Sequence, residues 1–231
     1  IDFKYGEALE TADKIMTYKL TVKTIAKRHG LYASFMPKPK YGMCGSGMHI
    51  NMSLFNKEGQ NIFVDENDKN GLSKEAYNFI AGLMKHMRSM TAIINPIVNS
   101  YKRLVPGYEA PTYIAWSATN RSPLIRVPAA RGLGTRVELR SPDCATNPYL
   151  AIAVCLAAGL DGIKNNLQPV DSIQRDIYSM TDEERDEAGI ENLPKNLYEA
   201  IQEMRKSDFV KGVLGKEVFK KYIKAKEEEW M

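Results

Sequence analysis

A nearly uninterrupted apolar run from Tyr149 to Ile163 limits the architectures open to this chain. Asn147 and Pro148 precede the run, and a capping Asn followed by Pro at the first helical position is a typical helix start. A helix that is apolar on all sides must be surrounded by other elements. We therefore expect residues 149–163 to form a buried helix inside a domain of ordinary size.

The rest of the sequence alternates helical and strand patterns without a regular βαβ order. Apolar spacing predicts helices over 7–29, ended by Gly30, and from Ser73 toward Pro96. After Asn166 the pattern turns to polar helices, with amphipathic segments at 193–205 and 217–229. Strands are expected over 32–36, 48–55, 113–117 and 135–141. This order of elements favours an α+β fold, in which helices flank an antiparallel sheet. The C-terminal part, from about residue 167, is expected to be helical.

Positive charge is concentrated in one stretch of the chain. The net charge is +4, yet residues 102–140 contain seven basic residues against only Glu109 and Glu138, so the remainder sums to −1. Six of the seven are arginines, whose planar guanidinium suits carboxylate and phosphate. An anion site is favoured over a solvated basic face, which would mix in Lys and Glu. The stretch has no basic helix and no interleaved aromatics, which disfavours a nucleic-acid-binding module.

The sequence also indicates where the protein works. No apolar run approaches the roughly 20 residues that span a bilayer, and the first residues do not form a signal peptide. The three cysteines, Cys44, Cys144 and Cys155, form neither a disulfide framework nor a CxxC pair. We expect a reduced, cytoplasmic protein. Because the first residue is Ile1 and the end is abrupt, we also expect a piece of a longer chain.

Two strands carry polar side chains on one face. His49, Asn51 and Ser53 alternate with Ile50, Met52 and Leu54, so a polar stripe follows a glycine-rich loop. This stripe is either a ligand site or plain solvent exposure. Of the other two histidines, His29 is expected to complement a helix end, and His86 is expected to be a packing or surface residue within a helix.

In the second strand Arg136, Glu138 and Arg140 share a face. A carboxylate between two guanidiniums stays ionised. It either forms a salt-bridge ladder or helps to hold a divalent cation next to phosphate oxygens.

Residues 99–111 form the third candidate, a long loop interrupted by Pro106, Gly107 and Pro111. Long ordered loops often cover binding sites. Glu109 lies near the tip, where it could act as a mobile acid or base.

Taken together, these motifs resemble glutamine synthetase of the bacterial type I class. The likeness runs in order through nearly the whole chain. It rests on Phe35-Met36-Pro37-Lys38-Pro39, Gly45-Ser46-Gly47-Met48-His49, the stretch 99–111, Asn120-Arg121-Ser122, Arg136-Val137-Glu138-Leu139-Arg140 and Asn147-Pro148-Tyr149-Leu150.

The resemblance implies a catalytic domain of the glutamine synthetase type, whose fold is similar to that of guanido kinases. It implies an ATP-dependent ligase that makes L-glutamine from L-glutamate and ammonia through γ-glutamyl phosphate, with Mg²⁺ or Mn²⁺, in a cytoplasmic dodecamer. The family's small N-terminal β-grasp domain, first catalytic strands and further metal-binding glutamates would lie upstream of Ile1. The chain alone is therefore expected to be inactive.

The resemblance also implies roles for single residues. His49 and Glu138 would bind the metal, and Ser53, Arg121, Arg126 and Arg136 would contact the nucleotide. Cys44, Gly45 and Arg103 would contact glutamate. Arg121 and Arg126 would neutralise the phosphates, and Arg140 would face the transferred phosphoryl group and the substrate side chain. Glu109 would close over the site and accept a proton from ammonium.

Two residues depart from the family pattern. Cys44 stands where the family usually has Asn, and Asn51 stands where some members have His. A thiol cannot replace an amide as paired donor and acceptor. Cys44 therefore leaves a catalytically inactive homologue open as an alternative, although His49, Glu138, Glu109 and the arginines are retained. A ligase that joins glutamate to another amine also stays open, because the loop around Glu109 indicates only a proton acceptor.

Overall fold

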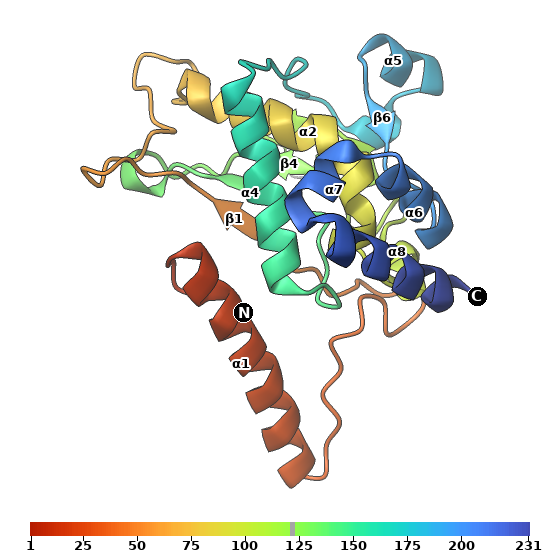
Figure 1. The fold of residues 1–231 in the computed structure, drawn as a ribbon. Coiled ribbons are helices and arrows are strands. Elements are labelled where there is room, and N and C mark those ends of the chain that lie inside the picture. The colour runs from red at the N-terminus through yellow and green to blue at the C-terminus, as the bar shows by residue number, and fades with distance from the viewer. Residues whose placement is uncertain (121–122) are drawn as a thin grey trace.

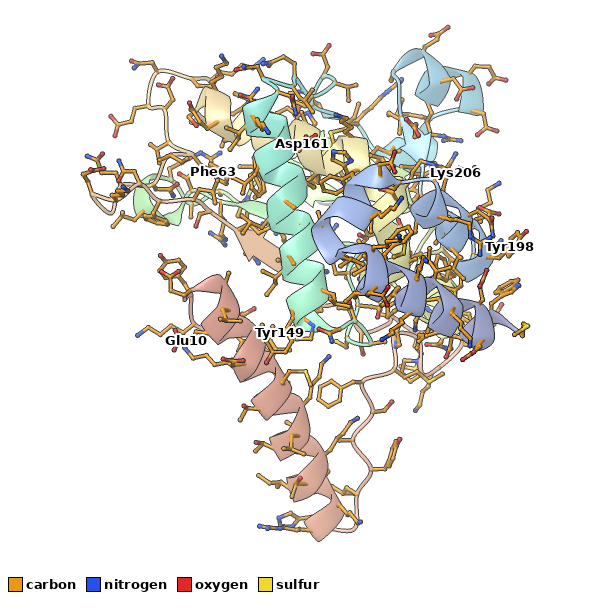
Figure 2. The ribbon with its side chains drawn as sticks, viewed as in Figure 1. Glu10, Phe63, Tyr149, Asp161, Tyr198 and Lys206 are labelled. Atoms are coloured by element: carbon orange, nitrogen blue, oxygen red, sulfur yellow. The ribbon has the colours of Figure 1, made fainter. Side chains whose placement is uncertain are left out.

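The computed structural model describes residues 1–120 and 123–231. A body of helices and short strands forms most of the molecule, and helix α1 (Ala8–Arg28) extends away from it (Figure 1). Residues 29–47 return toward the body without regular secondary structure. The N-terminal half of α1 meets the start of α4 (Pro148–Lys164), where the Tyr149 hydroxyl donates a 2.6 Å hydrogen bond to Asp13 (Figure 2).

The main sheet has four strands in the order β1 (Ile50–Met52), β5 (Val137–Leu139), β4 (Ile125–Arg126) and β3 (Trp116–Ser117). The pairs β1–β5 and β5–β4 are antiparallel, whereas β4–β3 is parallel. A second small sheet pairs β2 (Tyr113–Ile114) with β6 (Glu191–Asn192). The α+β class is confirmed, and the expected antiparallel sheet carries one parallel edge that the pattern did not predict.

Helices form the rest of the body. The long ones are α2 (Lys74–Ile94), α4, α6 (Leu197–Arg205) and α8 (Lys216–Trp230), as the spacing predicts. Shorter ones are α3 (Val98–Arg103), α5 (Asp182–Glu187), α7 (Asp208–Leu214) and the 3₁₀ turns Gly132–Gly134 and Ile177–Ser179. Helix α3 corrects part of the expected loop 99–111, because only its second half is irregular.

Helix α2 lies at the centre of the core. Its Ser73 cap accepts a hydrogen bond from the amide of Ala76, as expected. Phe79, Leu83 and Met87 are fully buried, and the core joins α2 to α4, α6 and one face of the main sheet. That sheet face carries apolar residues of β1, β4 and β5: Ile50, Met52, Ile125, Val137 and Leu139. The opposite face is therefore free for polar side chains.

Helix α4 begins as predicted, with the Asn147 side chain accepting from the amides of Tyr149 and Leu150. It is not buried on all sides, however. Val154, Cys155 and Ala158 are inside, whereas Leu160 is 45% exposed. The expectation of full burial was wrong because α2, α7 and α1 cover only part of the helix surface.

Residues 32–36, all of them described, form no strand, so this prediction was wrong. The segment lies along α1 instead. The Phe35 ring meets Tyr18 edge-on at 5.9 Å between centroids, and the Lys23 ammonium lies 5.7 Å from the Phe35 centroid. The aromatic and β-forming residues that suggested a strand therefore pack on a helix and, in the described part of the chain, pair with no strand.

Candidate active site

The polar face of the main sheet presents one row of facing residues. In the register of β1, β5 and β4, Asn51 pairs with Glu138, and Glu138 pairs with Arg126. Residues paired across antiparallel strands project from the same face with Cβ atoms about 5 Å apart. The strand pairing thus brings three segments, far apart in the sequence, to one site.

Glu138 lies at the centre of this row. Its Oε1 is 2.9 Å from His49 Nδ1, and its Oε2 accepts a 2.9 Å hydrogen bond from Arg126 Nη1. Burial alone would raise the pKa of the Glu138 carboxyl. The His49 hydrogen bond and the charges of His49, Arg126 and Arg140 outweigh burial, so that this pKa is lowered. The carboxylate therefore stays ionised although its side chain is only 9% exposed.

Arg136 and Arg140, which directly precede and follow β5, lie on either side of this carboxylate. Arg136 Nε donates to Asn51 Oδ1 at 2.9 Å, which orients the guanidinium along the polar face. Arg140 is buried, and burial lowers the pKa of its guanidinium, whereas the charges of Glu138 and Glu109 raise it. A buried guanidinium still carries its charge at neutral pH. The face is therefore strongly positive around one carboxylate.

Arg103 is held by backbone carbonyls next to this face. Its guanidinium donates to the carbonyl oxygens of Ser141 at 2.6 Å and Arg140 at 3.1 Å. The glycines of the 45–47 loop pack against it. A Cβ on Gly47 would lie 2.5 Å from Arg103 Nη2 and 3.1 Å from His49 Nε2, and a Cβ on Gly45 would lie 3.0 Å from Arg103 Cγ. Only glycine lets the loop approach this closely.

Asp143 fixes the turn that supplies these carbonyls, and the sequence reading missed it. Its carboxylate is fully buried and accepts from Asn95 Nδ2 and from the amide of Ala145, each at 2.9 Å. The neighbouring Pro142 carbonyl accepts from the amide of Met48 at 2.9 Å. The available signal was a charged residue directly after Pro142, shortly after the expected strand 135–141.

Glu109 is presented by a constrained loop. It is exposed, and its φ of 58° lies in the left-handed region that disfavours residues with a Cβ. The Tyr178 hydroxyl donates to the carbonyl of Ala110 at 3.1 Å, directly after it. Burial lowers the pKa of the Arg140 guanidinium and the charge of Glu109 opposes this, so the two charges lie within electrostatic reach of each other. Backbone strain of this kind is often found at functional sites.

The structure thus brings most of the predicted site residues into one region: Gly45, His49, Arg103, Glu109, Arg126, Arg136, Glu138 and Arg140. Cys44 is exposed next to Gly45, and Ser53 is half-buried just after β1. Arg121 lies outside the described residues. Asn51, which had been noted only as a departure from the family, orients Arg136.

The pair His49 and Glu138 fits a divalent cation in its chemistry, since it combines an imidazole nitrogen with an ionised carboxylate. Among the described residues no group of three His, Cys, Asp or Glu side chains could hold a metal ion. These two side chains would therefore supply part of a coordination sphere, and water, phosphate oxygens or other protein groups would complete it.

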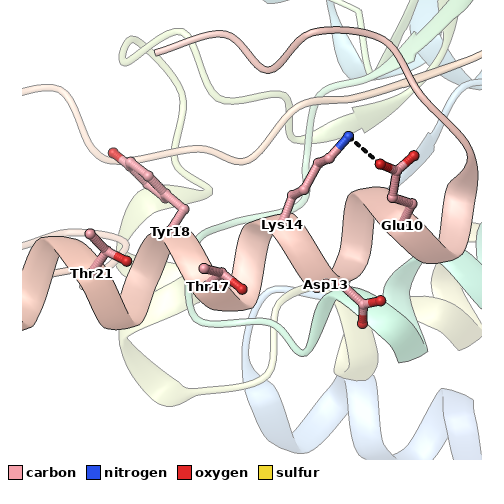
Figure 3. A pocket seen from close by; sticks show the side chains of 6 residues that line it. All are labelled: Glu10, Asp13, Lys14, Thr17, Tyr18 and Thr21. Carbon is pink, nitrogen blue, oxygen red and sulfur yellow. Dashed lines mark ion pairs between the residues drawn. The ribbon is translucent and has the colours of Figure 1, made fainter.

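Other surface features lie apart from this region. A shallow hollow runs along α1 and is lined by six side chains of that helix, among them the ion pair of Lys14 and Glu10 (Figure 3). None of these six is a predicted site residue. Within the described residues, no helix combines the length and the apolar character required to cross a membrane.

The fold and this region define an α+β domain with an arginine-rich face around one ionised carboxylate. Comparison with known protein families identifies the family to which this domain belongs. The family described as "Glutamine synthetase, catalytic domain" matches residues 1–231, and the chain belongs to this family. The motif resemblance is thereby confirmed.

Curated relatives named glutamine synthetase share high identity with the chain. The protein of Clostridium saccharobutylicum is 65% identical, over 100% of this chain and 52% of its own length. That of Methanosarcina mazei is 58% identical, over 100% of this chain and 51% of its own length. The chain thus spans about half the length of the curated relatives it matches.

Solved structures agree on the fold. The structure titled "Apo GmaS without ligand" superposes with a TM-score of 0.86 at 39% identity, over 98% of this chain and 51% of that one. The structure titled "GmaS/ADP complex-Conformation 1" gives a TM-score of 0.87 at 38% identity, over 99% of this chain and 52% of that one.

Proposed function

We propose that this chain is the catalytic part of a glutamate–ammonia ligase, which uses ATP to make L-glutamine. In this reaction the glutamate side-chain carboxylate attacks the γ-phosphorus of ATP and ADP leaves. Ammonia then attacks the carbonyl carbon of γ-glutamyl phosphate, and phosphate leaves. The single observation that carries the proposal is the ionised Glu138 held between His49 and Arg126 on an arginine-rich face.

On the nucleotide side, His49 and Glu138 would hold a Mg²⁺ or Mn²⁺ ion, which supplies charge neutralisation for the ATP phosphates when bound. Arg126 and Arg136, oriented by Glu138 and Asn51, would contact the phosphates. Ser53 and Arg121 are proposed nucleotide contacts as well. Phosphoryl transfer depends mainly on positioning and charge stabilisation, which clustered arginines provide. The relative solved with ADP supports nucleotide binding on this fold.

On the glutamate side, Arg103 would bind the α-carboxylate, because its guanidinium is fixed by carbonyls beside the glycine loop. Gly45 and Cys44 would line this position. Arg140 would face the side-chain carboxylate and the transferred phosphoryl group, which Arg121 would help to neutralise. Glu109 would take the proton that ammonium loses. The dodecamer and the cytoplasmic location implied by the resemblance stay predictions.

Removing either proposed metal ligand tests the nucleotide side. In a full-length ligase that carries this sequence, Glu138→Ala and His49→Ala should each weaken Mn²⁺-dependent binding of ATP by about 10²-fold, because each removes a direct ligand. Titration calorimetry measures the change. His86→Ala is the matched control. His86 lies apart from the site, and its Nε2 is 2.8 Å from Asp161 Oδ2. Unchanged affinity in both site variants, with normal folding, would refute the assignment.

The 231-residue chain by itself should form glutamine only at background rates. Its described residues provide two grouped metal-ligating side chains rather than three, and it spans about half of its relatives. A coupled assay that detects glutamine, with ATP and Mg²⁺ or Mn²⁺, measures this. Turnover near that of a full-length glutamine synthetase would contradict the prediction.

A ligase that joins glutamate to another amine is the second candidate. The relatives solved as GmaS share the fold, and Glu109 would serve any protonated amine as a proton acceptor. Replacing ammonium by methylammonium in the assay of the full-length ligase separates the two. A kcat/KM that is higher for methylammonium than for ammonium would favour this candidate. Absence of turnover with every amine would favour the inactive homologue.

A further inference from the structure

Lys38 is a buried lysine that the reaction described above does not use. It is 8% exposed, and its Nζ donates a hydrogen bond to the carbonyl of Met43. The same ammonium lies 3.7 Å from the centroid of the Tyr108 ring. None of the ion pairs among the described residues involves Lys38. Burying an ammonium is costly unless it has partners, so these two contacts carry most of its compensation.

The backbone of Lys38 is fixed as well. Its amide donates to Asn99 Oδ1 at 2.7 Å, and its carbonyl accepts from Asn99 Nδ2 at 3.1 Å. Asn99 belongs to α3, the same helix that carries Arg103. Lys38 is therefore held at a set position relative to the arginine that is proposed to bind glutamate.

The two partners of the ammonium lie in two different loops. Met43 directly precedes Cys44 and Gly45, and Tyr108 directly precedes Glu109. Neither residues 39–46 nor residues 104–112 form a helix or strand. We propose that Lys38 is a positioning residue that joins these loops, so that the groups proposed to bind glutamate and to accept the ammonium proton are placed together. This proposal rests on the proposed function.

A cation–π contact suits this task. A desolvated ammonium over an aromatic face gives a stable contact without requiring one hydrogen-bond direction. When this contact is removed, the Tyr108 loop keeps two residues with a positive φ, Gly107 at +87° and the strained Glu109. The open conformations of the loop should then become about tenfold more populated, which is the shift that loss of one such contact produces.

The first test measures loop order in the 231-residue chain by amide hydrogen exchange. Lys38→Met keeps the aliphatic stem and removes the charge. It should speed exchange about tenfold at two protected amides, that of Ala110, which donates to Tyr108, and that of Ser46, which donates to Pro37. Lys40→Met is the matched control, because Lys40 is exposed in the same loop. Unchanged exchange at both amides would overturn the proposal.

The second test uses kinetics of a full-length ligase that carries this sequence. Lys38→Met should raise the KM for glutamate about tenfold and leave the KM for ATP within about twofold, because the nucleotide side of the face is untouched. Lys38→Arg should restore most of the loss. A merely structural role would instead change both KM values and the melting temperature together.

A double-mutant cycle identifies the contact itself. Tyr108→Phe keeps the ring and should behave like the unchanged protein, whereas Tyr108→Leu should reproduce the effect of Lys38→Met. Adding Tyr108→Leu to Lys38→Met should then cost little more. Full additivity in hydrogen exchange would overturn the proposal. If the full-length enzyme forms no γ-glutamyl product at all, the proposed function fails, while the exchange data still decide whether the two loops are joined.

Discussion

Glu109→Ala should lower glutamine formation by about 10²- to 10⁴-fold, the range typical for removing a positioned general base. The loss should appear mostly in kcat, because the proton is taken after glutamate and ATP have bound. Binding of both substrates should stay nearly normal, since His49, Glu138 and Arg126 contact one another rather than this loop. Steady-state kinetics of a full-length ligase carrying this sequence measure the change.

The backbone at Glu109 provides a sharp control. Its φ of 58° favours glycine, so Glu109→Gly relieves strain while removing the carboxylate. If Glu109 only shapes the loop, the glycine variant keeps the activity. If the carboxylate accepts the proton, Glu109→Gly and the isosteric Glu109→Gln both lose the glutamine-forming activity. In both variants γ-glutamyl phosphate should still form, which a burst of ADP reveals. Full kcat in Glu109→Gly would exclude the proton-acceptor role.

The parts of the fold that depend on neighbouring residues could be predicted from the sequence. Caps and spacing located α2 and α4, because the capping side chain and the helix it starts are adjacent in the chain. The segment 32–36 was predicted wrongly because a strand also needs a partner, and here Phe35 packs on α1 instead. The parallel pairing of β3 with β4 likewise depends on contacts that no local pattern records.

The same distinction applies to the site. The pleat of residues 136–140 placed Arg136, Glu138 and Arg140 on one face, and the structure agrees, since Val137 and Leu139 are fully buried. Pairing between strands could not be predicted, so neither the contact of His49 with Glu138 nor that of Asn51 with Arg136 followed from the pattern. Lys38 was noted only as part of a motif and Asp143 was not noted, because the contacts of both come from groups distant in the sequence, such as Tyr108 and Asn95.

Close packing between α2 and α4 is another feature that no local pattern shows. Gly82 of α2 and Gly162 of α4 meet backbone to backbone. A Cβ on Gly162 would overlap the carbonyl oxygen of Asn78 and lie 2.8 Å from the amide nitrogen of Gly82. A Cβ on Gly82 would overlap the carbonyl oxygen of Ala158 in the same way. Because the obstacle on both sides is backbone, no side-chain rotation can relieve the overlap.

Gly162→Ala should therefore destabilise the protein by about 3 kcal/mol, at the upper end of what overpacking costs. In a chain of this size, this corresponds to a fall in melting temperature of roughly 10 °C, which calorimetry can measure. Gly212→Ala is the matched control, because Gly212 lies inside α7 and its Cβ would meet nothing within 4 Å. There alanine should stabilise the helix by about 0.5–1 kcal/mol. Equal melting temperatures for the two variants would show that α2 and α4 are not packed this closely.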